Sequence, residues 1–230
     1  MFDLKKIQQL LNTEPGKKLL QEAFTHRSYA VEHNLSFDNQ RLEFLGDAVV
    51  DAVLSEHLFN LYPDSPEGDL TKMRSALVCE AALASLAKVL NLGSLLRIGH
   101  GEVDSGGVER DSTLADLFEA VMGALYLGAG WETCRELLLE LYTAKFPDPR
   151  QMLLQINPKG KLQELSQHYW NVTPAYRVFS QQGPQHDPFY EVEVFLKKWV
   201  AHGGGKNRKA AEFDAAKNLY QHLLKTGIKF

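Results

Sequence analysis

The first 145 residues carry apolar side chains spaced three and four apart, which is the spacing of one face of an α-helix. Nothing in this part of the chain alternates between apolar and polar residues with the period of two that strands show. The predicted helices cover residues 5–12, 16–26, 39–59, 67–93, 111–130 and 131–146. The pattern therefore predicts an all-α domain over residues 1–146.

A proline-rich segment, "FPDPRQMLLQINPKG", follows the helical part and contains three prolines in short order. Proline cannot donate a backbone hydrogen bond and interrupts regular elements. We therefore expect a linker over residues 147–157.

The pattern changes after the linker. Residues 160–170 have helical spacing, whereas residues 175–183 and 189–203 alternate with period two, as strands do. Residues 207–224 return to helical spacing. The order α-β-β-β-α predicts a small α+β domain over residues 158–228.

Composition places this 230-residue chain, 44% of it hydrophobic, among soluble globular proteins of one or two domains. No apolar run approaches the roughly 20 residues that a membrane span needs, and the N-terminus lacks the apolar core of a signal peptide. Cys79 and Cys134 show no metal-ligand spacing. We expect free thiols, no membrane partner and a cytoplasmic location.

The formal net charge of −4 hides an uneven distribution. From Pro158 to the end there are 11 Lys and Arg against 6 Asp and Glu, a balance of +5, which leaves −9 for the rest of the chain. An acidic part beside a basic part indicates metal chemistry in the first and polyanion binding in the second.

Two pairs of acids interrupt apolar helices. Glu43 and Asp47 lie four apart in residues 39–59, and Asp116 and Glu119 lie three apart in residues 111–130. Residues at these spacings share one face of a helix, so each pair places two like charges side by side.

Each of these helices also carries a glycine, Gly46 or Gly123, which leaves a bare patch where a neighbouring helix can approach. If the two helices meet there, four carboxylates converge. Hard divalent cations prefer such oxygen ligands, and Mg²⁺ suits them best when substrate phosphates complete its shell.

Other interpretations of these acids stay open at this point. The carboxylates could be half-exposed or paired with one of three arginines, Arg27, Arg41 and Arg74. Asp51 continues the face of Glu43 and Asp47 and is typical of a solvated surface. Glu67 could supply the negative charge favoured in the first turn of its helix.

The stretch "HGGGKNRKAAEFDAA" leads from a glycine loop into a helix, with Asn207 placed to cap it and Lys206, Arg208 and Lys209 around its first turn. Backbone N–H groups, the helix dipole and these cations together favour an anion. In a domain of α-β-β-β-α order this indicates double-stranded RNA, whose shape is recognised through two minor grooves and the phosphates between them. The other expected contacts are Gln163 and Glu164 in the first helix and His186 in the loop between the first two strands.

The chain resembles bacterial ribonuclease III over nearly its whole length. The resemblance rests on "RLEFLGDAVV", "FTHRSYA", "EGDLTKMRSALV", "SGGVERDSTLADLFEAVMGALYLG" and "GGGKNRKAAE", which occur in the order of the family. It implies an endonuclease domain that forms a homodimer and a double-stranded-RNA-binding domain, acting on ribosomal precursors and structured messenger RNA. We expect the seam of the dimer around Phe44.

The resemblance also implies roles for individual acids. The metal-binding carboxylates are Glu43, Asp47, Asp116 and Glu119, with Asp47 and Glu119 favoured as direct ligands of Mg²⁺, for which Mn²⁺ is a plausible substitute. Glu67 falls on an acid that the family places at the cutting site. The family usually has Glu where this chain has Gln40, a position expected near the RNA.

The expected reaction is metal-assisted hydrolysis of double-stranded RNA that leaves 5′-phosphate and 3′-hydroxyl ends. We expect His26 and Ser28 to hold helices in register rather than to do chemistry. The competing hypothesis is a double-stranded-RNA-binding regulator that has lost cleavage, and Gln40 is the feature in its favour.

Overall fold

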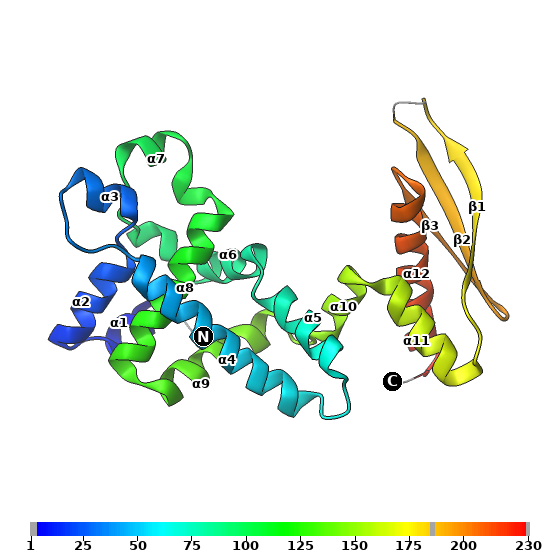
Figure 1. Ribbon diagram of the computed structural model, residues 1–230, viewed down its shortest axis with the longest axis horizontal. Coiled ribbons are helices and arrows are strands. Elements are labelled where there is room, and N and C mark those ends of the chain that lie inside the picture. Colours follow the sequence, from blue (N-terminus) through cyan, green and yellow to red (C-terminus); the bar gives the residue numbers. More distant parts are fainter. Residues whose placement is uncertain (1–3, 185–186, 229–230) are drawn as a thin grey trace. The chain divides into compact units, whose positions relative to one another are not determined.

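The computed structural model describes residues 4–184 and 187–228 (Figure 1). Contacts between residues divide the chain into two compact units, Met1–Pro149 and Arg150–Phe230, called the first unit and the second unit below.

The described regular elements of the first unit are all helices, as the spacing of apolar residues predicts, and one isolated bridge joins Thr25 to Arg97 (Figure 1). Its helices are α1 Leu4–Leu10, α2 Glu14–Ala23, α3 Arg27–Glu32, α4 Gln40–Leu61, α5 Glu67–Leu77, α6 Glu80–Val89, α7 His100–Asp104, α8 Asp111–Ala129 and α9 Trp131–Lys145, with short 3₁₀ turns η1 Leu92–Leu95 and η2 Gly107–Glu109.

The core of the first unit is built around α8, which is apolar around nearly its whole circumference and therefore buried. Leu117, Phe118 and Val121 are fully buried there, and Val53 and Leu54 of α4 are buried with them. Helices α2, α4 and α6 pack around α8. This arrangement fixes the polar side chains of α8 relative to those of α4.

The region expected as one helix over residues 67–93 is two helices, α5 and α6. Val78 ends α5, and Cys79 adopts an extended backbone with φ −68° and ψ 153° before α6 begins. No glycine or proline lies at this break, and the apolar spacing continues across it. The sequence therefore gives no sign of the turn.

The second unit contains α10 Arg150–Ile156, α11 Pro158–Trp170, β1 Ala175–Gln182, β2 Phe189–Leu196, β3 Trp199–Gly205 and α12 Arg208–Lys225. The strands form an antiparallel sheet in the order β1-β2-β3. From α11 onward the order is the predicted α-β-β-β-α.

The core of the second unit lies between the sheet and the helices α11 and α12. Leu162 and Leu165 of α11 and Leu219 of α12 are fully buried against Val192 and Val194 of β2. The two strand residues are two apart and so face the same side of the sheet. One face of the sheet is therefore covered by helices.

The segment expected as a linker, residues 147–157, contains α10. Pro147 and Pro149 precede this helix and Pro158 follows it, so the prolines flank a short helix instead of interrupting it. None of the helices in the described ranges is both long and apolar enough to cross a membrane.

Candidate metal centre and nucleic-acid interface

Helices α4 and α8 cross in contact at two glycines. A Cβ atom on Gly46 would lie 1.8 Å from the carbonyl oxygen of Glu119, and one on Gly123 would lie 2.3 Å from the carbonyl oxygen of Leu42. No real Cβ atom is tolerated so close to a backbone oxygen, so both positions require glycine. The predicted close approach of the two helices is confirmed.

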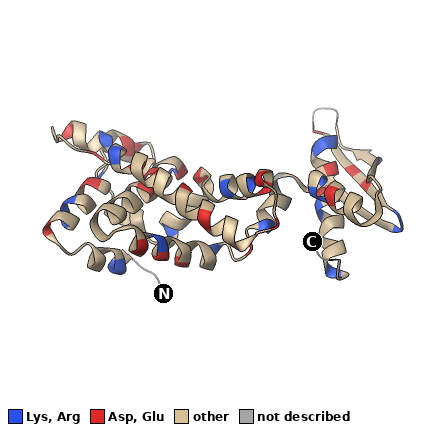
Figure 2. Cartoon of the chain, turned by 60° about the horizontal axis from the view of Figure 1, so that its bottom comes forward, with Lys and Arg blue, Asp and Glu red and all other residues tan. Residues whose placement is uncertain are grey.

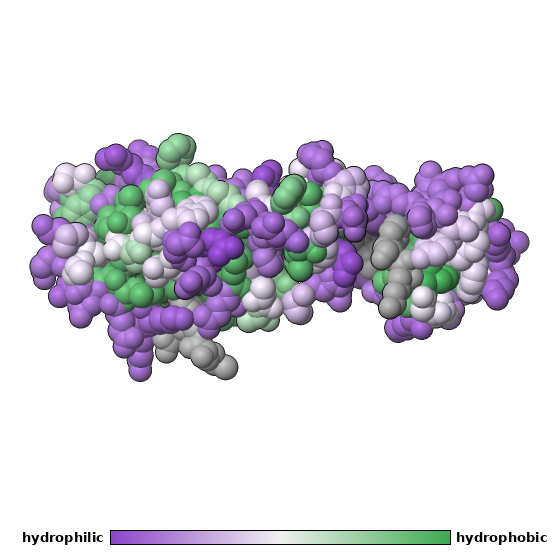
Figure 3. Space-filling model, turned by 90° about the horizontal axis from the view of Figure 1, so that it is seen from below, coloured by the Kyte–Doolittle hydropathy of each residue, from purple (hydrophilic) through white to green (hydrophobic). Residues whose placement is uncertain are grey.

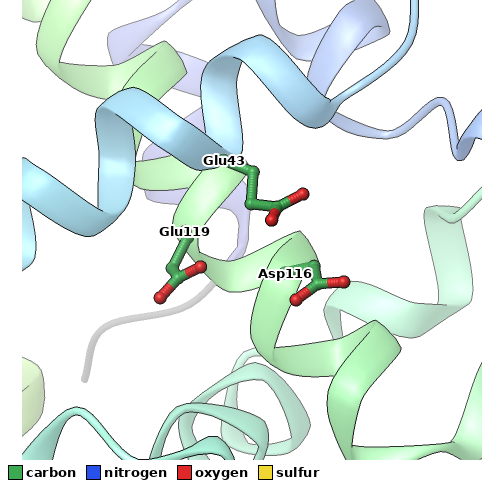
Figure 4. Close-up of side chains that lie close together, drawn as sticks. All are labelled: Glu43, Asp116 and Glu119. Carbon is green, nitrogen blue, oxygen red and sulfur yellow. The ribbon is translucent and has the colours of Figure 1, made fainter.

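The crossing brings together three of the predicted carboxylates, Glu43 of α4 and Asp116 and Glu119 of α8, called the acid trio below (Figure 4). One carboxylate oxygen from each lies within 4.8 Å of the others, and all three side chains are half-buried. Figure 4 shows that the three side chains project from two different helices. Oxygens at this separation can share one small cation.

The surroundings of the trio disfavour negative charge. Burial, and then the charges of Asp47, Asp116, Glu43 and Asp51, raise the pKa of Glu119 to about 8. Burial and neighbouring acids also raise the pKa of Glu43. The pKa of Asp116 is raised by burial, although His26 acts in the opposite direction. A divalent cation would remove this repulsion and replace the proton on Glu119.

Asp47 is exposed, and its oxygens are outside the group formed by the trio, although its charge contributes to the raised pKa values of Glu119 and Glu43. Its role as a direct ligand stays a prediction.

The sequence left open that arginines neutralise these acids. The structure shows such a pair at Asp51, a neighbour of the trio. The Nε atom of Arg74 lies 3.8 Å from Oδ1 of Asp51, and its Nη1 atom donates to Ser55. Oδ1 of Asp51 is buried and accepts no hydrogen bond within the described residues. Among those residues no arginine forms an ion pair with a member of the trio. The sequence pattern places Asp51 on a solvated surface and gives no sign of its buried oxygen.

Glu67 is the first residue of α5, where its charge favours the helix, and Oε1 accepts a hydrogen bond of 2.7 Å from Thr71. It is not a member of the trio. Its role at the cutting site stays a prediction.

His26 and Ser28 connect the start of α3 to the start of α7. The Nδ1 atom of His26 accepts from the backbone N–H of Ser28 and lies 2.7 Å from its hydroxyl oxygen. That hydroxyl oxygen accepts a hydrogen bond of 2.8 Å from the backbone N–H of Gly99. These contacts agree with the expected role in holding helices in register.

In the second unit, Asn207 caps α12 as predicted, because Oδ1 accepts a hydrogen bond of 2.8 Å from the backbone N–H of Ala210. Lys206, Arg208 and Lys209 are exposed around this first turn. Arg208 donates to Glu212 at 2.8 Å, a contact that was not predicted from the sequence. Figure 2 shows how acidic and basic positions are distributed over each unit.

The remaining predicted RNA contacts lie on several elements. Gln163 and Glu164 are exposed on α11, and Glu164 forms an ion pair of 2.6 Å with Lys161. Gln40 begins α4 in the first unit and accepts a hydrogen bond from Arg27. His186 lies outside the described residues.

Comparison with known proteins agrees with this architecture. A family model described as ribonuclease-III-like matches residues 16–146, and one described as a double-stranded RNA binding motif matches residues 158–223. Ribonuclease 3 of Moorella thermoacetica is 45% identical over 200 residues, covering 85% of this chain and 84% of that protein. Ribonuclease 3 of Natranaerobius thermophilus is 40% identical over 225 residues and covers 97% of each chain.

Solved structures match the first unit. A nuclease domain of ribonuclease III from Campylobacter jejuni is 42% identical, with a TM-score of 0.57, and covers 64% of this chain and all of that domain. A second structure of the same domain gives a TM-score of 0.56. Family model, relatives and structures agree, and the chain belongs to the ribonuclease III family of endoribonucleases.

Proposed function

We propose that this chain hydrolyses double-stranded RNA in a Mg²⁺-dependent reaction that leaves 5′-phosphate and 3′-hydroxyl ends. The observation that carries the proposal is the acid trio, whose oxygens gather within 4.8 Å at a helix crossing that only glycine permits. The relatives named Ribonuclease 3 support the assignment of RNA as substrate. Ribosomal precursors and structured messenger RNA are the proposed targets, in the cytoplasm.

The residues of the crossing fit a hard divalent cation. Every donor of the trio is a carboxylate oxygen, and repulsion among them is relieved only by a proton or a cation. We assign the site to Mg²⁺, with Mn²⁺ as a substitute. When bound, the cation supplies positive charge to the phosphate and acidifies an attacking water.

For the individual acids we propose the roles expected from the sequence. Glu119 and Asp47 bind the cation directly, Glu43 and Asp116 complete or orient its shell, and Glu67 acts at the cutting site. Glu119 is the most constrained of them, since its own backbone carbonyl forms the contact with Gly46.

We assign residues 1–146 to the endonuclease domain, 147–157 to the linker and 158–228 to the RNA-binding domain. In the last, the exposed cations at the start of α12, with Gln163, Glu164 and His186, form the proposed duplex contacts. Arg208 and Lys209 bind phosphates across the major groove.

A homodimer is part of the proposal. The Phe44 side chain is 80% exposed on α4, although it is a large apolar group, and the space-filling view shows apolar patches among the hydrophilic residues of the first unit (Figure 3). The nuclease domain from Campylobacter jejuni has a region involved in dimer formation. A dimer seam around Phe44 would bury this ring and give two sites related by a two-fold axis.

A cleavage assay tests the proposed function. Labelled duplex RNA is incubated with Mg²⁺ or with Ca²⁺, using the unaltered protein and Glu119→Gln. We expect cutting with Mg²⁺ only, and a loss of at least about a thousandfold in Glu119→Gln, because metal charge stabilisation is worth several kcal/mol.

The matched control is Glu136→Gln, which removes the same charge from an exposed position of α9 and should cut normally. RNA that is bound but not cut by the unaltered protein under every condition would support the regulator hypothesis instead. Products with 2′,3′-cyclic phosphates would contradict hydrolysis by an external water.

A further inference from the structure

An open pocket of about 480 Å³ adjoins the acid trio in the first unit. It is formed where the start of α3, the start of α4, α7 and α8 meet, and Glu43 and Asp116 of the trio belong to its wall. Because the pocket is open and adjoins the trio, a nucleotide strand at the proposed cleavage site would pass beside it. Its wall contains one residue whose charge matches such a strand, Arg27.

Among the described residues, Arg27 is the one arginine in a pocket wall whose other formally charged side chains are carboxylates. Four carboxylates line the pocket, from Glu32, Glu43, Glu102 and Asp116. Arg27 is exposed and forms no ion pair with any of them or with any other described residue. The acids otherwise repel a polyanion, so a guanidinium that no carboxylate has neutralised is the group able to attract one.

Two of the wall acids already have partners. Glu32 accepts hydrogen bonds of 3.1 Å from both the backbone N–H and the ring of His100, and its pKa is lowered by these contacts. Glu102 accepts a hydrogen bond of 3.3 Å from Nη1 of Arg110. Each of these two carboxylates therefore has a hydrogen-bond donor other than Arg27.

The partner of Arg27 is neutral. Its Nη1 atom donates a hydrogen bond of 3.3 Å to Oε1 of Gln40, the first residue of α4. An amide oxygen can orient a guanidinium without cancelling its charge. The backbone of Gln40 is held as well, because its N–H donates to Oδ1 of Asp38 at 3.1 Å.

The backbone around Arg27 is also held. The N–H of His26 donates to the carbonyl oxygen of Arg97 at 2.9 Å, and the N–H of the buried Asn39 donates to the carbonyl oxygen of Thr25 at 2.9 Å. The second of these bonds joins the residue just before Gln40 to Thr25, two residues before Arg27. The backbone positions that carry the side chains of Arg27 and Gln40 are therefore held close to each other.

We propose that Arg27 binds a phosphate of the RNA strand that enters this pocket, and that Gln40 is a positioning residue that holds Arg27 for that contact. The inference rests on the proposed function and assigns a substrate contact on the nuclease side of the molecule. It gives Gln40 a role through Arg27, in place of the direct RNA contact expected from the sequence. Its neutral amide serves this role because it leaves the charge of Arg27 intact.

The test measures binding of a labelled duplex with Ca²⁺ replacing Mg²⁺, over a series of salt concentrations. Arg27→Gln should weaken binding about tenfold and lower the slope of log K against log salt by about one, because one phosphate contact is lost. Arg27→Lys should keep the slope. Lys5→Gln, which removes a charge from an exposed site on α1, is the matched control and should change neither.

Two further measurements separate this role from a structural one. In Mg²⁺ turnover, Arg27→Gln should raise KM much more than it lowers kcat, and its unfolding temperature should stay unchanged. Gln40→Leu should weaken binding less than Arg27→Gln, and the double variant should be no weaker than Arg27→Gln alone. Additive effects would show that Gln40 acts independently of Arg27 and would overturn the pairing.

An unchanged salt slope in Arg27→Gln would overturn the phosphate contact. The failure of the proposed function is distinguishable, because the unaltered protein would then fail to cut duplex RNA with Mg²⁺. If it binds and cuts while Arg27→Gln behaves like Lys5→Gln, only this inference fails.

Discussion

The acidic cluster at the α4–α8 crossing and the basic cluster at the start of α12 lie in different surroundings. At the crossing, carboxylates of one sign lie half-buried within 4.8 Å of one another. At α12, Lys206, Arg208 and Lys209 are exposed. Arg208 also has an acidic partner, Glu212.

The two clusters differ in how freely their charged groups can move apart. The glycine contact fixes the two helices that carry the trio, so its members cannot move far apart, and their repulsion is relieved only by a proton or a cation. The cations of α12 repel one another little, since water screens them and they can move apart. A substitution at the crossing should therefore act on the whole site, whereas substitutions at α12 should act one contact at a time.

The largest effect is expected from Gly46→Ala, which puts a Cβ atom 1.8 Å from a backbone oxygen of α8. The helices must separate to relieve the overlap, at a cost of at least about 3 kcal/mol in the free energy of unfolding. Denaturant unfolding measures the loss. Gly68→Ala in α5 is the control, because its Cβ meets no atom within 4 Å and should be neutral or stabilising by up to about 1 kcal/mol.

The raised pKa of Glu119 at the crossing should also make the stability of the protein depend on pH. With its pKa raised to about 8, Glu119 holds a proton in the folded protein that the unfolded chain releases above its ordinary value of 4.5. Stability without metal should therefore fall as the pH rises between these two values.

Unfolding temperatures of chelator-treated protein at about pH 5.5 and about pH 8 measure this effect. Glu119→Gln cannot release a proton there and should lose several degrees less over the interval. Added Mg²⁺ should offset the loss at high pH in the unaltered protein but much less in the variant. Equal slopes in both proteins would mean that the trio is not under electrostatic strain.

Much of this contrast could be predicted from the sequence, because it depends on local spacing. The pairs Glu43–Asp47 and Asp116–Glu119, each near a glycine in an apolar helix, predict the helix crossing and its acids. The sequence does not predict which oxygens converge, since this depends on how far each helix is rotated at the contact. Asp47 is therefore exposed beside the trio instead of joining it.

The contacts that the sequence could not supply are those between distant residues or at unmarked turns. Arg27 and Gln40 meet only because separate backbone hydrogen bonds align the starts of α3 and α4. The extended backbone of Cys79 between α5 and α6 has no glycine or proline to signal it. Strand β1 likewise has a bulge at Phe179, between Val178 and Ser180, without a glycine.

At α12 a moderate effect is expected from removing two cations. Arg208→Gln together with Lys209→Gln should weaken duplex binding about tenfold and reduce the salt slope by one to two, because phosphate contacts release counterions. Lys209→Gln should account for more of the loss than Arg208→Gln, since only Arg208 is partly neutralised by Glu212. Salt titration of each variant in Ca²⁺ measures this.

Lys225→Gln is the control for that comparison. It removes an exposed charge from the last turn of the same helix and should leave the slope unchanged. If each single variant loses as much affinity as the double variant, Arg208 and Lys209 bind RNA as one unit. The two clusters would then not differ in the way proposed here.

The smallest effect is expected from Glu212→Gln, and its sign is informative. The carboxylate of Glu212 accepts hydrogen bonds of 2.5 Å from Lys159 and 2.8 Å from Arg208. Burial acts to raise the pKa of Glu212, but these hydrogen bonds outweigh it, and the pKa is lowered. Removing the charge frees two cations for phosphates, so duplex binding should tighten about twofold to threefold and its salt slope should steepen.

Weaker duplex binding in Glu212→Gln would change the comparison between the two clusters. If Glu212→Gln weakens binding instead, Glu212 must hold Lys159 and Arg208 in place for the RNA, as Gln40 is proposed to hold Arg27. The second unit would then depend on fixed geometry as the crossing does. A neutral amide at position 212 can still accept hydrogen bonds, so Glu212→Leu separates lost charge from lost positioning: tighter binding in both variants assigns the effect to charge alone.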